Sequence, residues 1–174
     1  MCDHNSEENK IHQLLIFKRE ELMFHVVNKL HIIKEKLESE NPGISPIIED
    51  IDDEHYGDEA TRSANLAYQE AVDAVYSLTK VPVEHDGTLD NTYGEPRSYV
   101  MAMKLPADFS KGTVALLKNL IHDFIVARVI EDWFKLVLPE RVDEWRIEGD
   151  RLKSKISEAL SKRVHGMERP YYIF

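Results

Sequence analysis

The sequence has one cysteine and no long apolar run. Cys2 has no partner in the chain, so neither a disulfide nor a thiolate metal site can form within it. The N-terminus, MCDHNSEENK, has acids where a secretory signal peptide has basic residues, and no apolar run follows them. Charged side chains interrupt the most apolar segment, 114–138, whereas a membrane-spanning helix needs about 20 mostly apolar residues. We therefore expect neither secretion nor membrane insertion.

Basic residues are also in deficit. The chain has 22 lysines and arginines against 32 aspartates and glutamates, for a formal net charge of -10. This charge repels phosphate backbones, and no basic cluster offsets it, so direct nucleic-acid binding is not expected. The 174 residues, 43% of them hydrophobic, are enough for one core. We predict a single cytoplasmic domain.

Catalytic and cofactor motifs are missing as well. The chain lacks the phosphate-binding loop, the dinucleotide-binding glycine pattern and the hydrolase nucleophile elbow. His-Glu-x-x-His is absent, and His25 and His31, six residues apart, do not share a helix face. Asp52-x-x-His55, in an acidic loop, has no second copy. We therefore predict no catalytic residue, no cofactor and no metal ligand, and hence a protein that is not an enzyme.

Two alternatives to a structural role stay open. Some helical nucleotide pyrophosphohydrolases hold magnesium with acidic pairs at helical spacing, and Glu131, Asp132 and Glu140 could supply such carboxylates. Pro139 interrupts this series, which weakens the fit to that pattern. The other alternative is a bacterial protein-interaction domain without any viral connection.

The N-terminal part of the sequence predicts a long helix. Apolar residues recur at helical spacing over 11–37, and Asn41-Pro42-Gly43 ends the pattern. A helical segment over 1–41 would be unusually long, so we expect either a break near 17–20 or a protruding helix. The prolines, glycines and acids of 42–58 predict a connecting loop.

The segment 59–166 predicts a helical core. Its centre is a helix over about 110–138 in which 124–127 should be buried on all sides. Before residues 124–127 the polar side chains fall on one side of the helix, and after them the polar side chains fall on the opposite side. We expect both groups to be exposed: Lys118, Asn119, His122 and Asp123 on the first side, and Arg128, Glu131, Asp132 and Lys135 on the second. After Pro139 a second amphipathic helix should pack antiparallel and end at Gly166.

Two short segments in this core look extended, and the side chains of the second alternate as in a β-strand. They are 81–85 and 97–105, and a turn-rich stretch joins them. They predict a β-hairpin over about 81–105. The expected fold class is therefore mainly α, a helical bundle around the central helix with a small β-hairpin. An aromatic tail, 167–174, follows.

The order of motifs in the second half of the chain is similar to that of a known class of proteins. The motifs are KLPADFS, then LLKNLIHDFIVARVIEDWFKLVLPE, then a tryptophan-containing helix ending in KISEALSKR, then an Arg-Pro-aromatic terminus. Over 59–174 the chain resembles small virion structural proteins of prophages of gut bacteria, of the head-tail connector or adaptor type. The resemblance implies a helical body with a hairpin arm, a ring of subunits between portal and tail, and no catalytic residue.

The hairpin tip, 86–96, and the aromatic tail are the predicted interaction surfaces. One subunit could use them to bind the next, by strand addition or by seating aromatic side chains in a groove. The candidate residues are Asp90, Asn91, Tyr93, Arg169, Tyr171, Tyr172 and Phe174. Expected partners are further copies of the chain or a portal or tail protein, in the cytoplasm or in a virion. Docking of the tail on its own subunit is equally compatible with the sequence.

Overall fold

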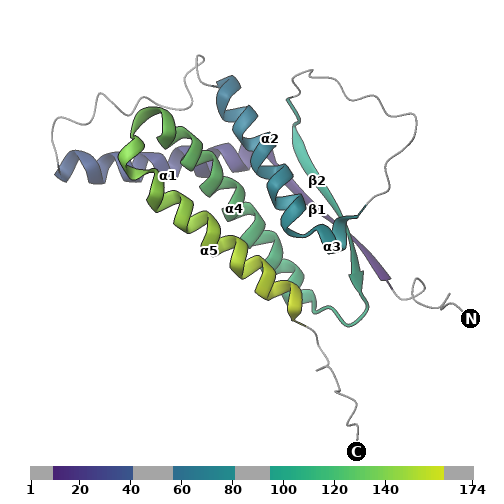
Figure 1. Cartoon of the computed structure of the whole chain (residues 1–174). Helices are drawn as coiled ribbons and strands as arrows, with labels where there is room; N and C mark the ends of the chain where they lie inside the picture. The colour runs from purple at the N-terminus through teal and green to yellow at the C-terminus, as the bar shows by residue number, and fades with distance from the viewer. Residues whose placement is uncertain (1–9, 41–56, 81–94, 163–174) are drawn as a thin grey trace, which may run out of the picture.

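The computed structural model describes residues 10–40, 57–80 and 95–162. The elements, in chain order, are β1 (Lys10–Lys18), α1 (Arg19–Glu40), α2 (Gly57–Ala74), α3 (Tyr76–Thr79), β2 (Ser98–Pro106), α4 (Lys111–Val137), the 3-10 turn η2 (Pro139–Arg141) and α5 (Val142–Ser161). In Figure 1, α5 lies alongside α4, and the two strands lie on the side of α2. The structure confirms a mainly α fold with a small two-stranded antiparallel sheet.

The central helix α4 is the core of the fold. Its residues Phe124, Ile125, Val126 and Ala127 have no exposed surface, as predicted, because they lie where the buried face of the helix changes sides. Burial of each large apolar side chain stabilises the fold by roughly 1.5 to 3 kcal/mol. Helix α5 follows α4 after the Pro139 turn, which prevents α4 from continuing and lets the chain reverse.

Helix α2 packs against α4 through a row of small side chains. Ala60, Ala64, Ala67 and Ala71 recur at helical spacing and are all buried. Alanine has almost no side chain to separate two helix backbones, so this face favours close packing. This row of alanines is therefore part of the core.

Residues 10–18 are a strand, so the prediction of a helix over 1–41 is wrong for this segment. The change from strand to helix falls at residues 18 and 19, inside the region where a break was expected. Leu15 and Phe17 are buried while Leu14 and Ile16 are exposed, which is the alternation of a strand with one buried face. The apolar residues of this segment fit both helical and strand spacing, and pairing with β2 decides between them.

The strand predicted at 97–105 is confirmed as β2. Its antiparallel partner among the described residues is β1, with Leu15 opposite Met101 and Phe17 opposite Tyr99. The sheet is therefore built from strands that are distant in the sequence. The predicted partner segment, 81–85, lies outside the described residues.

Within the described ranges, no helix combines the length and the apolar character that crossing a membrane requires.

Candidate functional site

The interaction residues predicted from the sequence all lie outside the described residues: Asp90, Asn91, Tyr93, Arg169, Tyr171, Tyr172 and Phe174. Their surroundings are not part of the structure described here.

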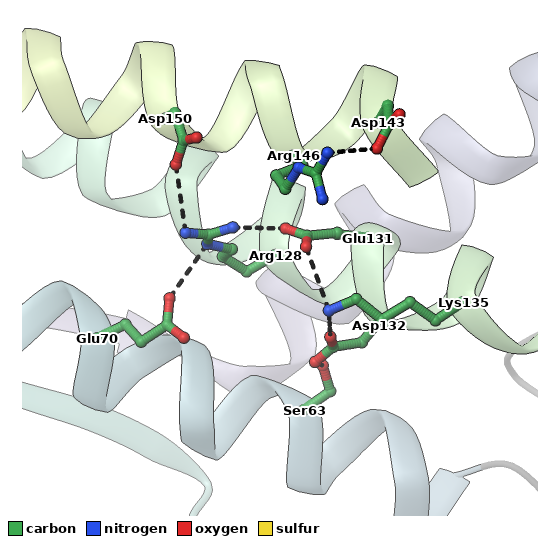
Figure 2. A network of polar contacts seen from close by, with 9 residues as sticks. All are labelled: Ser63, Glu70, Arg128, Glu131, Asp132, Lys135, Asp143, Arg146 and Asp150. Carbon is green, nitrogen blue, oxygen red and sulfur yellow. Dashed lines mark hydrogen bonds and ion pairs between the residues drawn. The ribbon is translucent and has the colours of Figure 1, made fainter. Parts of the chain in front are cut away.

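Arg128 and Glu131 form the centre of an ion-pair network between three helices (Figure 2). The Arg128 Nη1 atom donates to Glu131 Oε2 at 2.5 Å, its Nε lies 3.1 Å from Glu70 Oε2 on α2, and its Nη2 lies 3.5 Å from Asp150 Oδ1 on α5. Glu131 is only 4% exposed. Both side chains were predicted to be exposed, and this is wrong because α2 and α5 cover that side of α4.

Asp132 and Lys135 extend the network toward α2. Ser63 Oγ donates to Asp132 Oδ2 at 2.6 Å, and Lys135 Nζ lies 2.8 Å from Asp132 Oδ1 and 3.2 Å from Glu131 Oε1. Lys135 is exposed, as predicted, and Asp132 is half-buried. Each carboxylate of the Glu131 and Asp132 pair is thus matched by a cation from the same helix.

The carboxylates of this network raise the pKa values of its two cations, Arg128 and Lys135. Burial alone would lower the pKa of Arg128, but the hydrogen bond and charge of Glu131, together with Glu70 and Asp150, raise it overall. The pKa of Lys135 is raised chiefly by its hydrogen bond to Asp132, with Glu131 adding to the effect. Both shifts show that the network favours the charged forms of the two side chains.

The acids of the enzyme hypothesis do not converge. Glu140 is exposed on η2, beyond the end of α4, while Glu131 is buried against Arg128. Across the three described ranges, no three side chains among histidine, cysteine, aspartate and glutamate are grouped so that they could hold a metal ion. The arrangement observed is that of an ion-pair network that joins helices.

The second polar feature is the free edge of β1. The Arg19 N–H donates to the Arg97 carbonyl at 3.1 Å, and these two residues are opposite each other one step beyond the strand pair. Hydrogen-bonded and non-hydrogen-bonded pairs alternate along an antiparallel ladder. The even-numbered residues His12, Leu14 and Ile16 therefore turn their backbone N–H and C=O groups away from β2.

The two outer edges of the sheet differ. On β2, the Val100 carbonyl faces outward by the same alternation, and the Tyr68 hydroxyl of α2 donates to it at 2.9 Å. On β1, the Leu14 carbonyl accepts only the side-chain amide of the adjacent Gln13, at 3.0 Å, among the hydrogen bonds of the described residues. Among the described residues, no strand pairs with the outer edge of β1, so this edge is available to another strand.

An apolar groove of about 530 Å³ lies between this edge and the first turns of α4. Its lining includes apolar side chains from β1, from the end of β2 and from α4: Ile11, Leu14, Leu15, Ile16, Leu105, Phe109, Val114 and Ala115. Among the described residues that line it, the charged ones are Lys111 and Lys118, and none is acidic. We call this feature the β1 groove.

Exposed apolar side chains continue from the β1 groove onto the outer face of the sheet. Ile16 and Val100 are opposite each other in the register and each is 50% exposed, and Leu14 is 58% exposed. Apolar surface that is contiguous on two strands is typical of a protein interaction site.

A larger hollow, of about 1270 Å³, lies between α2, the start of β2 and the end of α4. Charges of both signs line it, among them Glu59, Arg62, Asp132 and Lys135. Asp132 and Lys135 pair with each other. This mixture of paired charges does not select one class of ligand.

The β1 groove was not predicted from the sequence. The prediction of a helix over 10–18 left no strand edge in this segment, and the lysines that line the groove, Lys111 and Lys118, belong to α4. Comparison with protein-family models, with curated proteins and with solved structures finds no match to this chain.

Proposed function

We propose that the chain is a non-enzymatic assembly subunit of the head-tail connector type, which binds an extended segment of a neighbouring copy along β1. The observation that supports this proposal is the outer edge of β1, which no described strand covers, beside an apolar groove whose described charged residues are both lysines. The resemblance of residues 59–174 to head-tail connector proteins is the reason for proposing this type of assembly.

Strand addition suits this geometry. An extended segment laid along β1 would hydrogen-bond to the outward N–H and C=O groups of His12, Leu14 and Ile16. Alternate side chains of that segment would point into the β1 groove and onto the outer face of the sheet. Backbone pairing would thus provide affinity, and the apolar lining would select the side chains.

Charge selects the segment 86–96 as the occupant. Residues 86–94 of this segment, DGTLDNTYGEP, lie outside the described residues, whereas Glu95 is described and lies 3.7 Å from Arg19 of its own subunit. The segment contains three acids, no lysine or arginine, and the apolar side chains Leu89 and Tyr93. Its negative charge complements Lys111 and Lys118, which line the β1 groove. The aromatic tail fits less well, because its Glu168 and Arg169 cancel and leave no net side-chain charge to complement the lysines.

Pairing of β1 with a second β1 is disfavoured by the same reasoning. An antiparallel pair centred on Leu14 would place Lys10 opposite Lys18 twice, and like charges directly opposite each other destabilise a sheet. Binding of a different segment is a head-to-tail contact, and repeated head-to-tail contacts close into rings when the rotation allows it.

The first test is the solution mass of the purified chain, measured by light scattering over a broad concentration range. We expect a closed oligomer larger than a dimer. A chain that stays monomeric at every concentration would contradict self-assembly, and a strict dimer would indicate a symmetric interface in place of the proposed one.

Substitutions then locate the interface. Leu14→Thr and Ile16→Thr remove exposed apolar surface and place a β-branched side chain, which suits a strand, at both positions, so we expect a folded chain of reduced mass. Ile147→Thr, at a 66% exposed position on α5, is the matched control and should leave the mass unchanged.

A charge exchange tests the occupant. We expect the double variant Lys111→Glu with Lys118→Glu to lose assembly, and we expect the further exchange of Asp86→Lys with Asp90→Lys to restore it. Failure of the restoration, with the four-residue variant still folded, would reject 86–96 as the bound segment.

A further inference from the structure

Two histidines that are distant in the sequence meet between α1 and α4. The Nδ1 atom of His25 and the Nε2 atom of His122 lie 2.6 Å apart, although the residues are separated by 97 positions. The rings are nearly perpendicular, at 78°, with centroids 4.8 Å apart. One nitrogen donates a proton to the other, so this geometry requires at least one neutral imidazole.

We propose that His25 and His122 form a binding site for a divalent transition-metal ion of the zinc type, in which the metal replaces the shared proton. Neutral imidazole nitrogens are preferred ligands of such ions. Zinc holds them at about 2.0 to 2.1 Å, so two nitrogens on a tetrahedral ion are about 3.3 Å apart. The two nitrogens therefore need to separate by about 0.7 Å from their hydrogen-bonded position.

The side chains can make this movement. His25 is exposed on α1, so its ring can rotate without displacing core residues, while the half-buried His122 is held on α4. Water would occupy the remaining coordination positions, because no third histidine, cysteine, aspartate or glutamate of the described ranges is now grouped with the pair. A site of this kind is open to solvent and would bind the ion reversibly.

The surrounding charges favour a cation. Glu21 lies one helical turn before His25 on α1, Asp123 follows His122 on α4, and Lys29 is the opposing positive charge among the groups that act on His122. The carboxylates thus outnumber the ammonium group around the pair.

This inference goes beyond the proposed function and does not depend on it. A bound ion would join α1 to α4 directly, whereas the proposed assembly interface lies at β1. The metal site can therefore be tested on the full chain in any oligomeric state.

The test is a zinc titration by isothermal titration calorimetry at pH 7.5, with the full chain. The chain has eight histidines, so weak binding elsewhere is expected and the informative quantity is the tightest phase. We expect that phase to correspond to one ion per chain. In His25→Ala it should disappear or weaken by at least about tenfold, because one of two protein ligands is lost.

Two further variants make the result decisive. His122→Gln keeps a polar side chain of similar size in the half-buried position and should lose the same phase. His31→Ala removes an exposed histidine of the same helix that pairs with Glu35 at 3.4 Å, and it should leave the titration unchanged. If the tightest phase is absent from the original chain, or persists in folded His25→Ala and His122→Gln, the proposal is overturned.

Discussion

Gly149 of α5 lies directly against the side chain of Arg128 of α4. A Cβ atom at position 149 would stand 3.5 Å from Cδ, Nε and Cζ of that arginine. The small residue at 149 lets α5 pass over the Arg128 side chain, and the adjacent Asp150 reaches the guanidinium group at 3.5 Å. The contact between Gly149 and Arg128 thus belongs both to the packing of α5 on α4 and to the ion-pair network of Figure 2.

Gly149→Ala should stabilise the protein by about 0.5 to 1 kcal/mol. The added Cβ meets Arg128 at an ordinary contact distance, and alanine favours the interior of a helix more than glycine does. Gly149→Leu should destabilise it, because the larger side chain would displace Arg128 from Glu131. Urea unfolding followed by circular dichroism measures both variants, and equal stability of the two would contradict this view of the contact.

Arg128→Met should lower the free energy of unfolding by about 3 kcal/mol. The methionine fills most of the space of the arginine stem but leaves the buried Glu131 with Lys135 as its cation. Loss of one member of a buried pair is costly because the other charge remains away from water. The measurement is again urea unfolding, with the slope of the transition checked for two-state behaviour.

Arg146→Met is the matched control for Arg128→Met. Arg146 pairs with Asp143 at 2.6 Å on the exposed face of α5, with both side chains more than half exposed. Exposed ion pairs contribute about 0 to 1 kcal/mol, so this variant should lose little stability. A loss as large as that of Arg128→Met would show that burial does not set the difference.

The stability of the chain should fall between neutral and mildly acidic pH in part because of His122. Burial and the charge of His25 lower its pKa in the folded chain below the value of about 6.5 expected in the unfolded chain. As the pH falls below that unfolded value, the unfolded state binds a proton first, and the folded state is disfavoured until the lowered folded pKa is passed. The contribution of His122 to the free energy of unfolding is therefore fully present above about pH 6.5 and is lost as the pH falls through the lowered folded pKa.

Urea midpoints measured at several pH values in the presence of a chelator test this dependence. The loss between pH 7.5 and pH 5 should be smaller in His122→Gln than in the original chain, since other titrating groups contribute equally to both. An identical loss in the two proteins would show that His122 does not contribute to it.

Addition of magnesium and a nucleoside triphosphate should leave the melting temperature unchanged. Glu131 and Asp132 are matched by Arg128 and Lys135, so they are not placed to hold the metal that a nucleotide pyrophosphohydrolase needs. A ligand that binds only the folded state raises its melting temperature. A dose-dependent increase would therefore favour the enzyme hypothesis over a structural role.

Several elements were predictable because local pattern and tertiary environment agree. The alternating residues of 97–105 face the core on one side only, so β2 has the expected form. The apolar centre of α4 at 124–127 has no polar side chain, so burial is the only stable arrangement for it.

Other elements could not be read from the pattern. Residues 10–18 contain apolar side chains at both helical and strand spacing, and pairing with β2, far away in the sequence, selects the strand. The polar residues Arg128 and Glu131 resemble a solvated helix face until α2 and α5 cover them. The sequence of one helix does not show whether a charged side chain is buried, because the residues that cover it and pair with it lie on other elements.

The sequence by itself therefore determined the fold class, the central helix and the alanine-lined packing of α2, because each depends on the periodicity of apolar residues along one segment. Only the tertiary structure decided the free edge of β1, the burial of Glu131 and the meeting of His25 with His122. These features depend on contacts between residues distant in the sequence, and such contacts leave no periodic trace in either segment alone.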